Sequence, residues 1–266
     1  MIIAQGEDMN FETIIFERQN HIGILTLNRP DQLNAFTTAM AREANQALAA
    51  MDSERDIRAL VLKGNGRAFC AGIDVSVLPM KGILEYRPWI REMEKAAWTI
   101  AHMVKPVIVA AHGVAAANGA GLVAAADLAI AAEGTRIGTT AINVGLFCMG
   151  PAVPLSRCLG RKLCLEMLLT GDFIDAERAE RIGLVNKVVP GDKLVDEAMN
   201  LAAKLASKSP VALQMGKKAF YTMSDMEYEK ALEYSGEMFA ELCTTEDAIE
   251  GVRAFKEKRE PVWKLR

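Results

Sequence analysis

Two glycine-containing stretches of this chain could do chemistry with backbone atoms alone. The first, GRAFCAGIDVSVL (66–78), follows the apolar run IRALVLKG, and the second, HGVAAANGAG (112–121), leads into a helical pattern. The first turn of a helix leaves backbone N–H groups unpaired, and the helix dipole adds about half a positive charge there. One N–H from each stretch would make an oxyanion hole, which stabilises negative charge developing on a carbonyl oxygen. Tight turns that need glycine would account for the same spacing.

An α/β core is expected to position these stretches. Short runs rich in Ile, Val and Leu, bounded by Gly, Pro or Asn, predict buried strands, and they lie at 22–27, 57–62, 106–111 and 128–132. Between the strands, residues 37–51 place apolar side chains on one helical face, with Thr37 or Thr38 as the N-cap. Strands that alternate with helices are typical of an α/β fold.

The last part of the chain has a different character. From Asp196 onward the pattern is almost wholly helical, with helix starts indicated at Ser209 and Thr245. We therefore expect a core over residues 1–195 and a helical region over residues 196–266. Residues 79–98 carry two prolines, a glycine and several charges, and are expected to be mobile and partly exposed.

Composition excludes several classes of protein. The net charge of −3 comes from 31 basic and 34 acidic residues without long runs of one sign, which argues against nucleic-acid or membrane-surface binding. The five cysteines form no CxxC pair, and with three histidines no zinc spacing appears, so we expect no metal site and a reducing, cytoplasmic setting. The first ten residues lack the features of a signal peptide.

One apolar segment, residues 106–132, is long enough to suggest a membrane span. His112, Asn118 and Asp127 interrupt it, which a lone membrane helix tolerates badly. Its favoured interpretation is a strand, a turn, a buried helix and a second strand.

Five stretches, in this order, resemble the successive signatures of the crotonase, or enoyl-CoA hydratase/isomerase, superfamily. They are LNRPDQLNAF (27–36), GRAFCAGIDV (66–75), KPVIVAAHGVAAANGAGLVAAADLAIAAE (105–133), LLTGDFIDAERAERIGLVNKVVP (168–190) and AFKEKREPVW (254–263). The piece NVGLFCMGPAV (143–153) also resembles a branch of that family, the enoyl-CoA hydratase domain-containing protein 3 type.

The resemblance implies the crotonase fold, with a core of repeated ββα turns and a C-terminal helical region used for trimerisation. It also implies a homotrimer or a dimer of trimers. The implied ligand is an acyl-CoA thioester whose enolate two backbone N–H groups stabilise. Coenzyme A is then part of the substrate, and no permanently bound cofactor is expected.

The same resemblance assigns site residues. The oxyanion donors would be the backbone N–H groups of Ile73 and Asn118, and Asn118 stands where the family usually has glycine. Asparagine tolerates a left-handed backbone better than most residues, so we expect it to hold the turn. The coenzyme A moiety would contact Ala71, Ile73, Asp74, Val75 and Ser76, and also Phe255 and Lys258, which in several members come from a neighbouring subunit. For Lys258, an exposed helix charge is an equal alternative.

The glutamate pair of the family's hydratases is absent. By position, Gly121 replaces the first glutamate and Ala141 the second. Hydration needs a proton donor at Cα and a base for water, so we expect little or no hydratase activity, and an isomerase would also lack its usual base. Another thioester reaction, such as hydrolysis or decarboxylation, is the enzyme hypothesis. A non-catalytic acyl-CoA-binding protein is the alternative.

Other reactive side chains lie near these positions. Cys148 is a candidate nucleophile, although the sequence supplies no base to activate it, and a buried structural thiol is its alternative. Asn143 lies where other members place alternative acids or bases. His112 is expected to satisfy a turn and Asp127 to be structural, while His102 lies on a helical pattern that leaves its orientation open.

Overall fold

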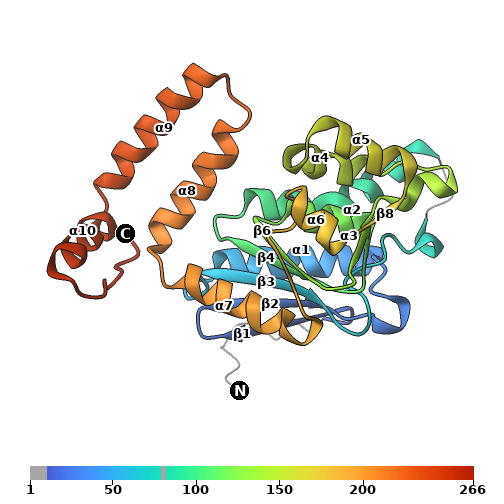
Figure 1. Ribbon diagram of the computed structural model, residues 1–266, viewed down its shortest axis with the longest axis horizontal. Helices are drawn as coiled ribbons and strands as arrows, with labels where there is room; N and C mark the ends of the chain where they lie inside the picture. The colour runs from blue at the N-terminus through green and yellow to red at the C-terminus, as the bar shows by residue number, and fades with distance from the viewer. Residues whose placement is uncertain (1–10, 79–81) are drawn as a thin grey trace.

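A six-stranded sheet forms the centre of the computed structural model, which describes residues 11–78 and 82–266 (Figure 1). The strand order is β1-β2-β3-β4-β6-β9, and only β1 and β2 are antiparallel neighbours in this sheet. The strands are β1 (Ile14–Gln19), β2 (Ile22–Leu27), β3 (Ala59–Gly64), β4 (Val107–Ala111), β6 (Leu128–Ala132) and β9 (Lys187–Val189).

The four strands predicted from the apolar runs are confirmed as β2, β3, β4 and β6. All six residues of β2 and all five of β4 are buried, as expected for parallel strands covered on both faces. Strand β3 begins at Ala59, two residues later than predicted, and its register pairs Ala59 with Ile22.

Helices cover both faces of this sheet. One apolar layer holds α1 (Thr38–Ser53), α2 (Ile83–His102) and α3 (Asn118–Ala125), and the opposite layer holds α7 (Leu194–Ala206). The predicted N-cap is confirmed at Thr37, whose hydroxyl oxygen accepts a hydrogen bond from the backbone N–H of Met40 at 3.2 Å. The segment 106–132 is confirmed as strand, turn, buried helix and strand.

A smaller sheet completes the core. It has the order β5-β7-β8, formed by β5 (Val114–Ala116), β7 (Arg136–Gly138) and β8 (Phe173–Asp175). Around it lie α4 (Met149–Cys158), α5 (Arg161–Thr170) and α6 (Ala176–Arg181), and four short 3-10 helices: η1 (Pro30–Gln32), η2 (Val75–Val77), η3 (Thr140–Val144) and η4 (Gly191–Lys193).

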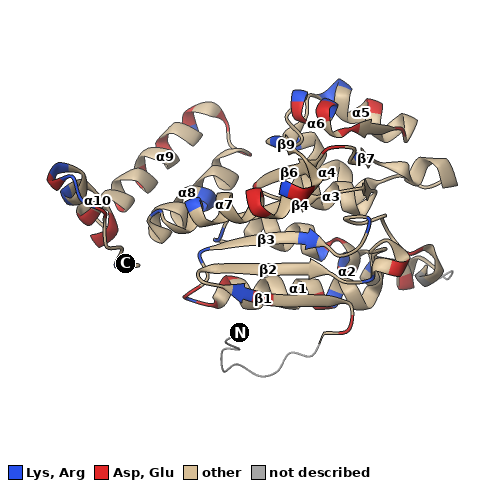
Figure 2. Cartoon of the chain, turned by 60° about the horizontal axis from the view of Figure 1, so that its bottom comes forward, with Lys and Arg blue, Asp and Glu red and all other residues tan. Residues whose placement is uncertain are grey.

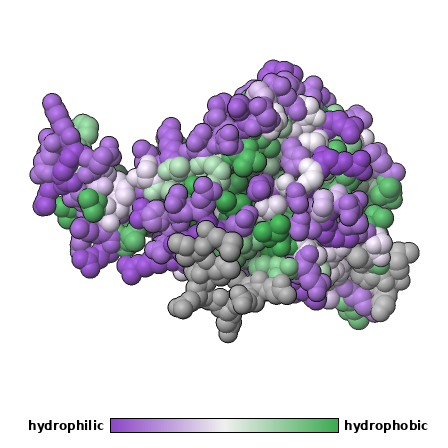
Figure 3. Space-filling view, turned by 90° about the horizontal axis from the view of Figure 1, so that it is seen from below, coloured by the Kyte–Doolittle hydropathy of each residue, from purple (hydrophilic) through white to green (hydrophobic). Residues whose placement is uncertain are grey.

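Three helices project from this core, and we call them the arm: α8 (Pro210–Met223), α9 (Tyr228–Cys243) and α10 (Glu246–Glu257) (Figure 1). The predicted starts are confirmed, because the Ser209 and Thr245 side chains each cap a helix N-terminus. The boundary predicted at residue 195 falls inside α7, which packs on the sheet, so the projecting part begins at Pro210. In the view of Figure 3, the projecting end of the molecule is mostly hydrophilic, with small separate apolar spots.

The segment 79–98, predicted to be mobile and partly exposed, is helical and partly exposed in its described part, and its mobility stays a prediction. Residues 79–81 lie outside the described residues, but α2 runs without interruption from Ile83 to His102. Pro88 lies in its second turn and removes only one i to i−4 hydrogen bond. The buried residues Met93, Ala96 and Ile100 follow helical spacing and anchor the helix on the core.

Charged residues of both signs are distributed over the surface (Figure 2). Within residues 11–78 and 82–266, no helix combines the length and the hydropathy that a membrane crossing needs. The same residues contain no group of three or more His, Cys, Asp or Glu side chains placed to hold a metal ion.

Candidate active site

The two glycine-containing stretches lie side by side. The N–H of Cys70 donates to the carbonyl of Val114 at 3.0 Å, and the N–H of Ala116 donates back to the carbonyl of Cys70 at 2.9 Å. A Cβ added to Gly72 would lie 3.0 Å from the Cβ of Ala117. Because Gly72 and Ala117 touch, the residues that follow them, Ile73 and Asn118, are brought together.

The backbone N–H groups of Ile73 and Asn118 are both without a hydrogen-bond acceptor among the described residues. Asn118 is the first residue of α3, where an N–H has no partner within the helix. Ile73 forms a parallel bridge with Phe36, but the two bonds of that bridge use the N–H groups of Phe36 and Asp74. Two unpaired N–H groups on contacting loops are the donors that an oxyanion hole needs, and we call them the candidate oxyanion hole.

The prediction that Asn118 adopts a left-handed backbone is wrong. The positive φ falls one residue earlier, at Ala117 (φ 46°, ψ −110°), and Asn118 already belongs to the helix. The Asn118 side chain turns toward α2 instead, where its Nδ2 donates to the carbonyl of Met93 at 3.3 Å.

The segment predicted to line coenzyme A is held in place by its own side chains. Asp74 Oδ1 accepts hydrogen bonds from the backbone N–H of Ser76 at 3.1 Å and from its hydroxyl at 2.6 Å. Arg29 contacts Asp74 Oδ2 at 3.2 Å. The Ser76 hydroxyl, and then the other hydrogen bonds and the Arg29 charge, lower the pKa of Asp74. Val75, at the start of η2, is exposed, whereas Ala71 donates its N–H to the carbonyl of Leu33.

Phe255 and Lys258 do not lie near that segment in the same chain. Both belong to the end of α10, and α10 and η2 occupy opposite ends of the molecule (Figure 1). Phe255 is 85% exposed, and Lys258 caps α10 in a left-handed conformation. The two residues would meet coenzyme A bound at residues 71–76 only if that ligand belonged to another copy of the chain.

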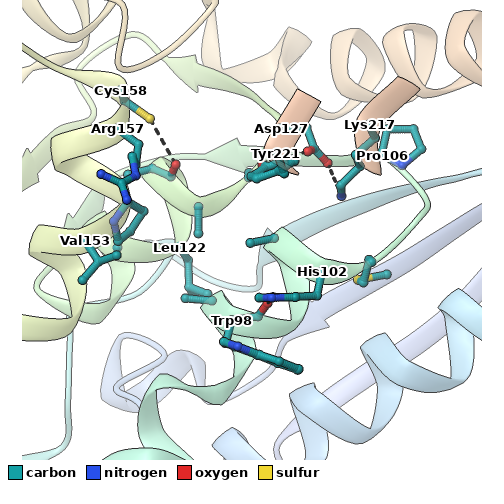
Figure 4. A pocket seen from close by; sticks show the side chains of 18 of the residues that line it. Trp98, His102, Pro106, Leu122, Asp127, Val153, Arg157, Cys158, Lys217 and Tyr221 are labelled. Atoms are coloured by element: carbon teal, nitrogen blue, oxygen red, sulfur yellow. Dashed lines mark hydrogen bonds and ion pairs between the residues drawn. The ribbon is translucent and has the colours of Figure 1, made fainter. Parts of the chain in front are cut away.

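A cleft of 1390 Å³ opens from Asn118 along α3 (Figure 4). Its walls come from α2, α3, α4 and α8, so the core and the arm both contribute to it. Its lining is mainly apolar, with Trp98, Leu122 and Val153 among the labelled side chains, and Phe36, the bridge partner of Ile73, also lines it. An apolar cleft with an unpaired backbone donor, the N–H of Asn118, in its lining is typical of a site for a small molecule with a polar head.

A hydrogen-bonded cluster closes the other end of the cleft. Lys217 on α8 donates to Asp127 at 2.7 Å and to the carbonyls of Ile100 and Lys105, each at 2.9 Å (Figure 4). The Tyr221 hydroxyl and a backbone N–H of β4 also donate to Asp127. Burial lowers the pKa of Lys217, and Asp127 opposes that shift. The structural role predicted for Asp127 is thereby confirmed, but its partners on α8 could not be predicted from the sequence.

Comparisons with known proteins agree with this geometry. Residues 17–266 match the family model described as enoyl-CoA hydratase/isomerase. The chain belongs to this family. A probable enoyl-CoA hydratase of Rhizobium meliloti is 36% identical over 97% of this chain and 100% of its own length.

Solved structures of the family have the same fold. The enoyl-CoA hydratase of Mycobacterium smegmatis superposes with a TM-score of 0.91 at 38% identity, over 95% of this chain and 99% of that chain. Human enoyl coenzyme A hydratase domain-containing protein 3 superposes with a TM-score of 0.91 at 31% identity, over 95% of this chain and 100% of that chain. The crotonase fold predicted from the sequence is therefore confirmed.

The two positions that the family resemblance assigns to the glutamate pair, 121 and 141, have different surroundings. Gly121 lines the cleft, and a Cβ added there would lie 3.2 Å from three atoms of Pro151, so α4 leaves little room for a longer side chain. Ala141 lies in η3, and its backbone opposes the pKa shift that burial causes at Cys148. Burial raises the pKa of Cys148, which disfavours the thiolate that a nucleophile needs. Its assignment as a nucleophile stays a prediction.

Three other side chains singled out in the sequence have defined places. A ring nitrogen of His112 lies 2.9 Å from the carbonyl oxygen of Gly66, which confirms its role in a turn. Asn143 donates to the carbonyl of Gly171 at 3.4 Å, at the end of α5. His102 lines the cleft, stacked on Trp98 with 4.0 Å between ring centroids.

The sequence analysis missed the wall of the cleft that α2 supplies. Glu94 and Trp98 lie on it, and neither was singled out because this segment was expected to be mobile. The helical spacing of Met93, Ala96 and Ile100 was the signal available in the sequence.

Proposed function

We propose that this chain binds an acyl-CoA thioester and polarises its carbonyl between the backbone N–H groups of Ile73 and Asn118. The observation that carries the proposal is the contact between Gly72 and Ala117, which brings together two residues with unpaired N–H groups, one of them, Asn118, in the lining of an apolar cleft. The thioester oxygen accepts from both groups, and the acyl group extends into the cleft. Family membership supports this ligand class.

The proposed reaction differs from hydration by a glutamate pair. Gly121 and Ala141 supply no carboxylate, and the closeness of Pro151 to Gly121 leaves little room for a longer side chain there. The reaction proposed is another one that charge stabilisation on the thioester oxygen accelerates, such as hydrolysis or decarboxylation. Removing one donor from an oxyanion hole costs about 10²- to 10³-fold in rate.

Binding and turnover test the proposal separately. Saturated, 2-enoyl and aromatic CoA thioesters are titrated by calorimetry, and each is then assayed for turnover. Absence of binding to all three classes would overturn the proposed ligand, and rapid hydration of a 2-enoyl-CoA would overturn the account of Gly121 and Ala141. Binding without any turnover would favour the non-catalytic alternative.

A backbone donor is removed most directly by proline. The N–H of Ile73 has no acceptor among the described residues, so Ile73→Pro deletes it without breaking a backbone hydrogen bond. We expect turnover to fall about 10²- to 10³-fold, while Ile73→Val, which keeps the N–H, stays near the wild-type rate. Circular dichroism shows whether each variant is folded. A folded Ile73→Pro chain with wild-type turnover would exclude this donor.

A further inference from the structure

Glu94 is an exposed residue of α2 that lines the same cleft as Asn118. It follows Met93, whose carbonyl accepts the hydrogen bond from the Asn118 side chain at 3.3 Å. A Cβ added to Gly150, in the first turn of α4, would lie 2.4 Å from Glu94 Oε1. The Glu94 carboxyl group therefore contacts the first turn of α4, while its own helix contacts the first residue of α3.

The carboxyl group of Glu94 has no hydrogen-bond or ion-pair partner among the residues that the structure describes. It is accessible through the cleft, whose lining beside it includes Ala97 and Pro151. Partial burial among such groups raises its pKa. By contrast Glu92, two residues earlier on α2, lies 3.7 Å from Arg42 and does not line the cleft. A carboxyl group that is free and reachable from the cleft in this way can exchange protons with a bound ligand.

We propose that Glu94 is the acid–base group that transfers a proton at Cα of the acyl thioester, in place of the glutamates missing at positions 121 and 141. The inference rests on the proposed function, because the oxyanion hole must hold the thioester. It narrows the substrate class to acyl thioesters whose reaction passes through an enolate.

The proton balance needs no co-reactant. The Glu94 carboxylate takes the proton from Cα, and the electrons of the broken C–H bond form the enolate, whose oxygen the N–H groups of Ile73 and Asn118 stabilise. The Glu94 carboxylic acid then returns its proton to Cα, or to Cγ when the thioester carries a double bond between Cβ and Cγ during isomerisation. In decarboxylation the enolate arises as CO₂ leaves, and the proton that Glu94 supplies completes the reaction. Simple thioester hydrolysis needs no such step.

Exchange of Cα protons for deuterium tests this role directly. The full chain is incubated with butyryl-CoA in D₂O, and deuterium at Cα is measured by mass spectrometry, with affinity measured in parallel by calorimetry. We expect wild-type exchange, and a fall of about 10²- to 10⁴-fold in Glu94→Gln with affinity unchanged within about threefold. Glu94→Asp should recover part of the rate, and the matched control Glu92→Gln should exchange like wild type.

A second variant keeps the carboxyl group and moves it. Gly150→Ala places a methyl group where Glu94 Oε1 now lies, so the carboxyl group must shift and the exchange rate should fall. Equal exchange by wild type and Glu94→Gln, or loss only in His102→Gln, would overturn the role of Glu94. A wild-type chain that binds butyryl-CoA without exchange would also overturn it while leaving the proposed binding intact. A chain that does not bind the thioester would overturn the proposed function and this inference together.

Discussion

The loops that form the candidate oxyanion hole and the arm are built in opposite ways. The loops are fixed by backbone hydrogen bonds between Cys70, Val114 and Ala116, and by contacts too close for side chains. The arm buries little: Pro210 is the only buried residue of α8, and the described residues of α9 include none. The structure of the loops is therefore determined by contacts within the chain. The arm instead exposes apolar side chains, such as Leu232 and Phe239, that the described residues of this chain do not bury.

The largest expected effect on stability comes from replacing a glycine of the loops with alanine. The same substitution in the arm serves as its control. A Cβ on Gly119 would lie 2.3 Å from the carbonyl oxygen of Cys70, so Gly119→Ala forces the two loops apart. We expect the free energy of unfolding to fall by about 3 kcal/mol or more, with loss of thioester turnover. The matched control is Gly236→Ala in α9, which has open space and should stabilise the helix by up to about 1 kcal/mol.

Urea denaturation followed by circular dichroism measures both variants of this pair. Similar unfolding energies for Gly119→Ala and Gly236→Ala would contradict the difference drawn between the two regions.

The next effect concerns the anchor of the arm. The side chains of Lys217 and Asp127 are 7% and 15% exposed, so Lys217→Met leaves a buried carboxylate without its cation. Removing one partner of a buried ion pair lowers the free energy of unfolding by about 3–5 kcal/mol. Lys218→Met, on the exposed neighbour, should change stability by less than about 0.5 kcal/mol. Thermal denaturation compares the two, and equal melting temperatures would show that the cluster does not hold α8.

The smallest effect on the single chain is expected on the exposed face of α9. Leu232→Ser with Phe239→Ser removes apolar side chains that are 55% and 66% exposed, so the free energy of unfolding of one chain should change little. If the arm forms the predicted trimer, the same change should shift the mass measured by light scattering toward the monomer. Glu237→Gln, a polar change on the same helix, serves as the control. An unaltered mass in an oligomeric protein would place the interface elsewhere.

The sequence was informative where local chemistry decides the structure. The run IGILTL becomes a fully buried strand, and Thr37, Ser209 and Thr245 cap helices because their hydroxyl groups satisfy N–H groups of the first turn. The pairing of Ile73 and Asn118 followed from family resemblance and stays a prediction, although the residues that precede them, Gly72 and Ala117, are in contact.

Long-range packing was beyond the sequence. Pro88 and the charges around it suggested mobility, but burial of one face of α2 outweighs the single hydrogen bond that the proline removes. Glu94 was missed because carboxylates were sought at positions 121 and 141, and only the fold brings α2 against α4. The distance between α10 and η2 likewise depends on how the arm leaves the core.

The backbone conformation of Ala117 has one further consequence. A non-glycine residue at φ 46° and ψ −110° stores about 1–3 kcal/mol of backbone strain, which persists only where the surroundings allow no relaxation. The surrounding contacts hold that peptide so firmly that its direction is set before any ligand arrives. The N–H of Asn118 would then need no reorganisation when charge develops on a bound oxygen, which is the property that makes a backbone dipole effective in catalysis.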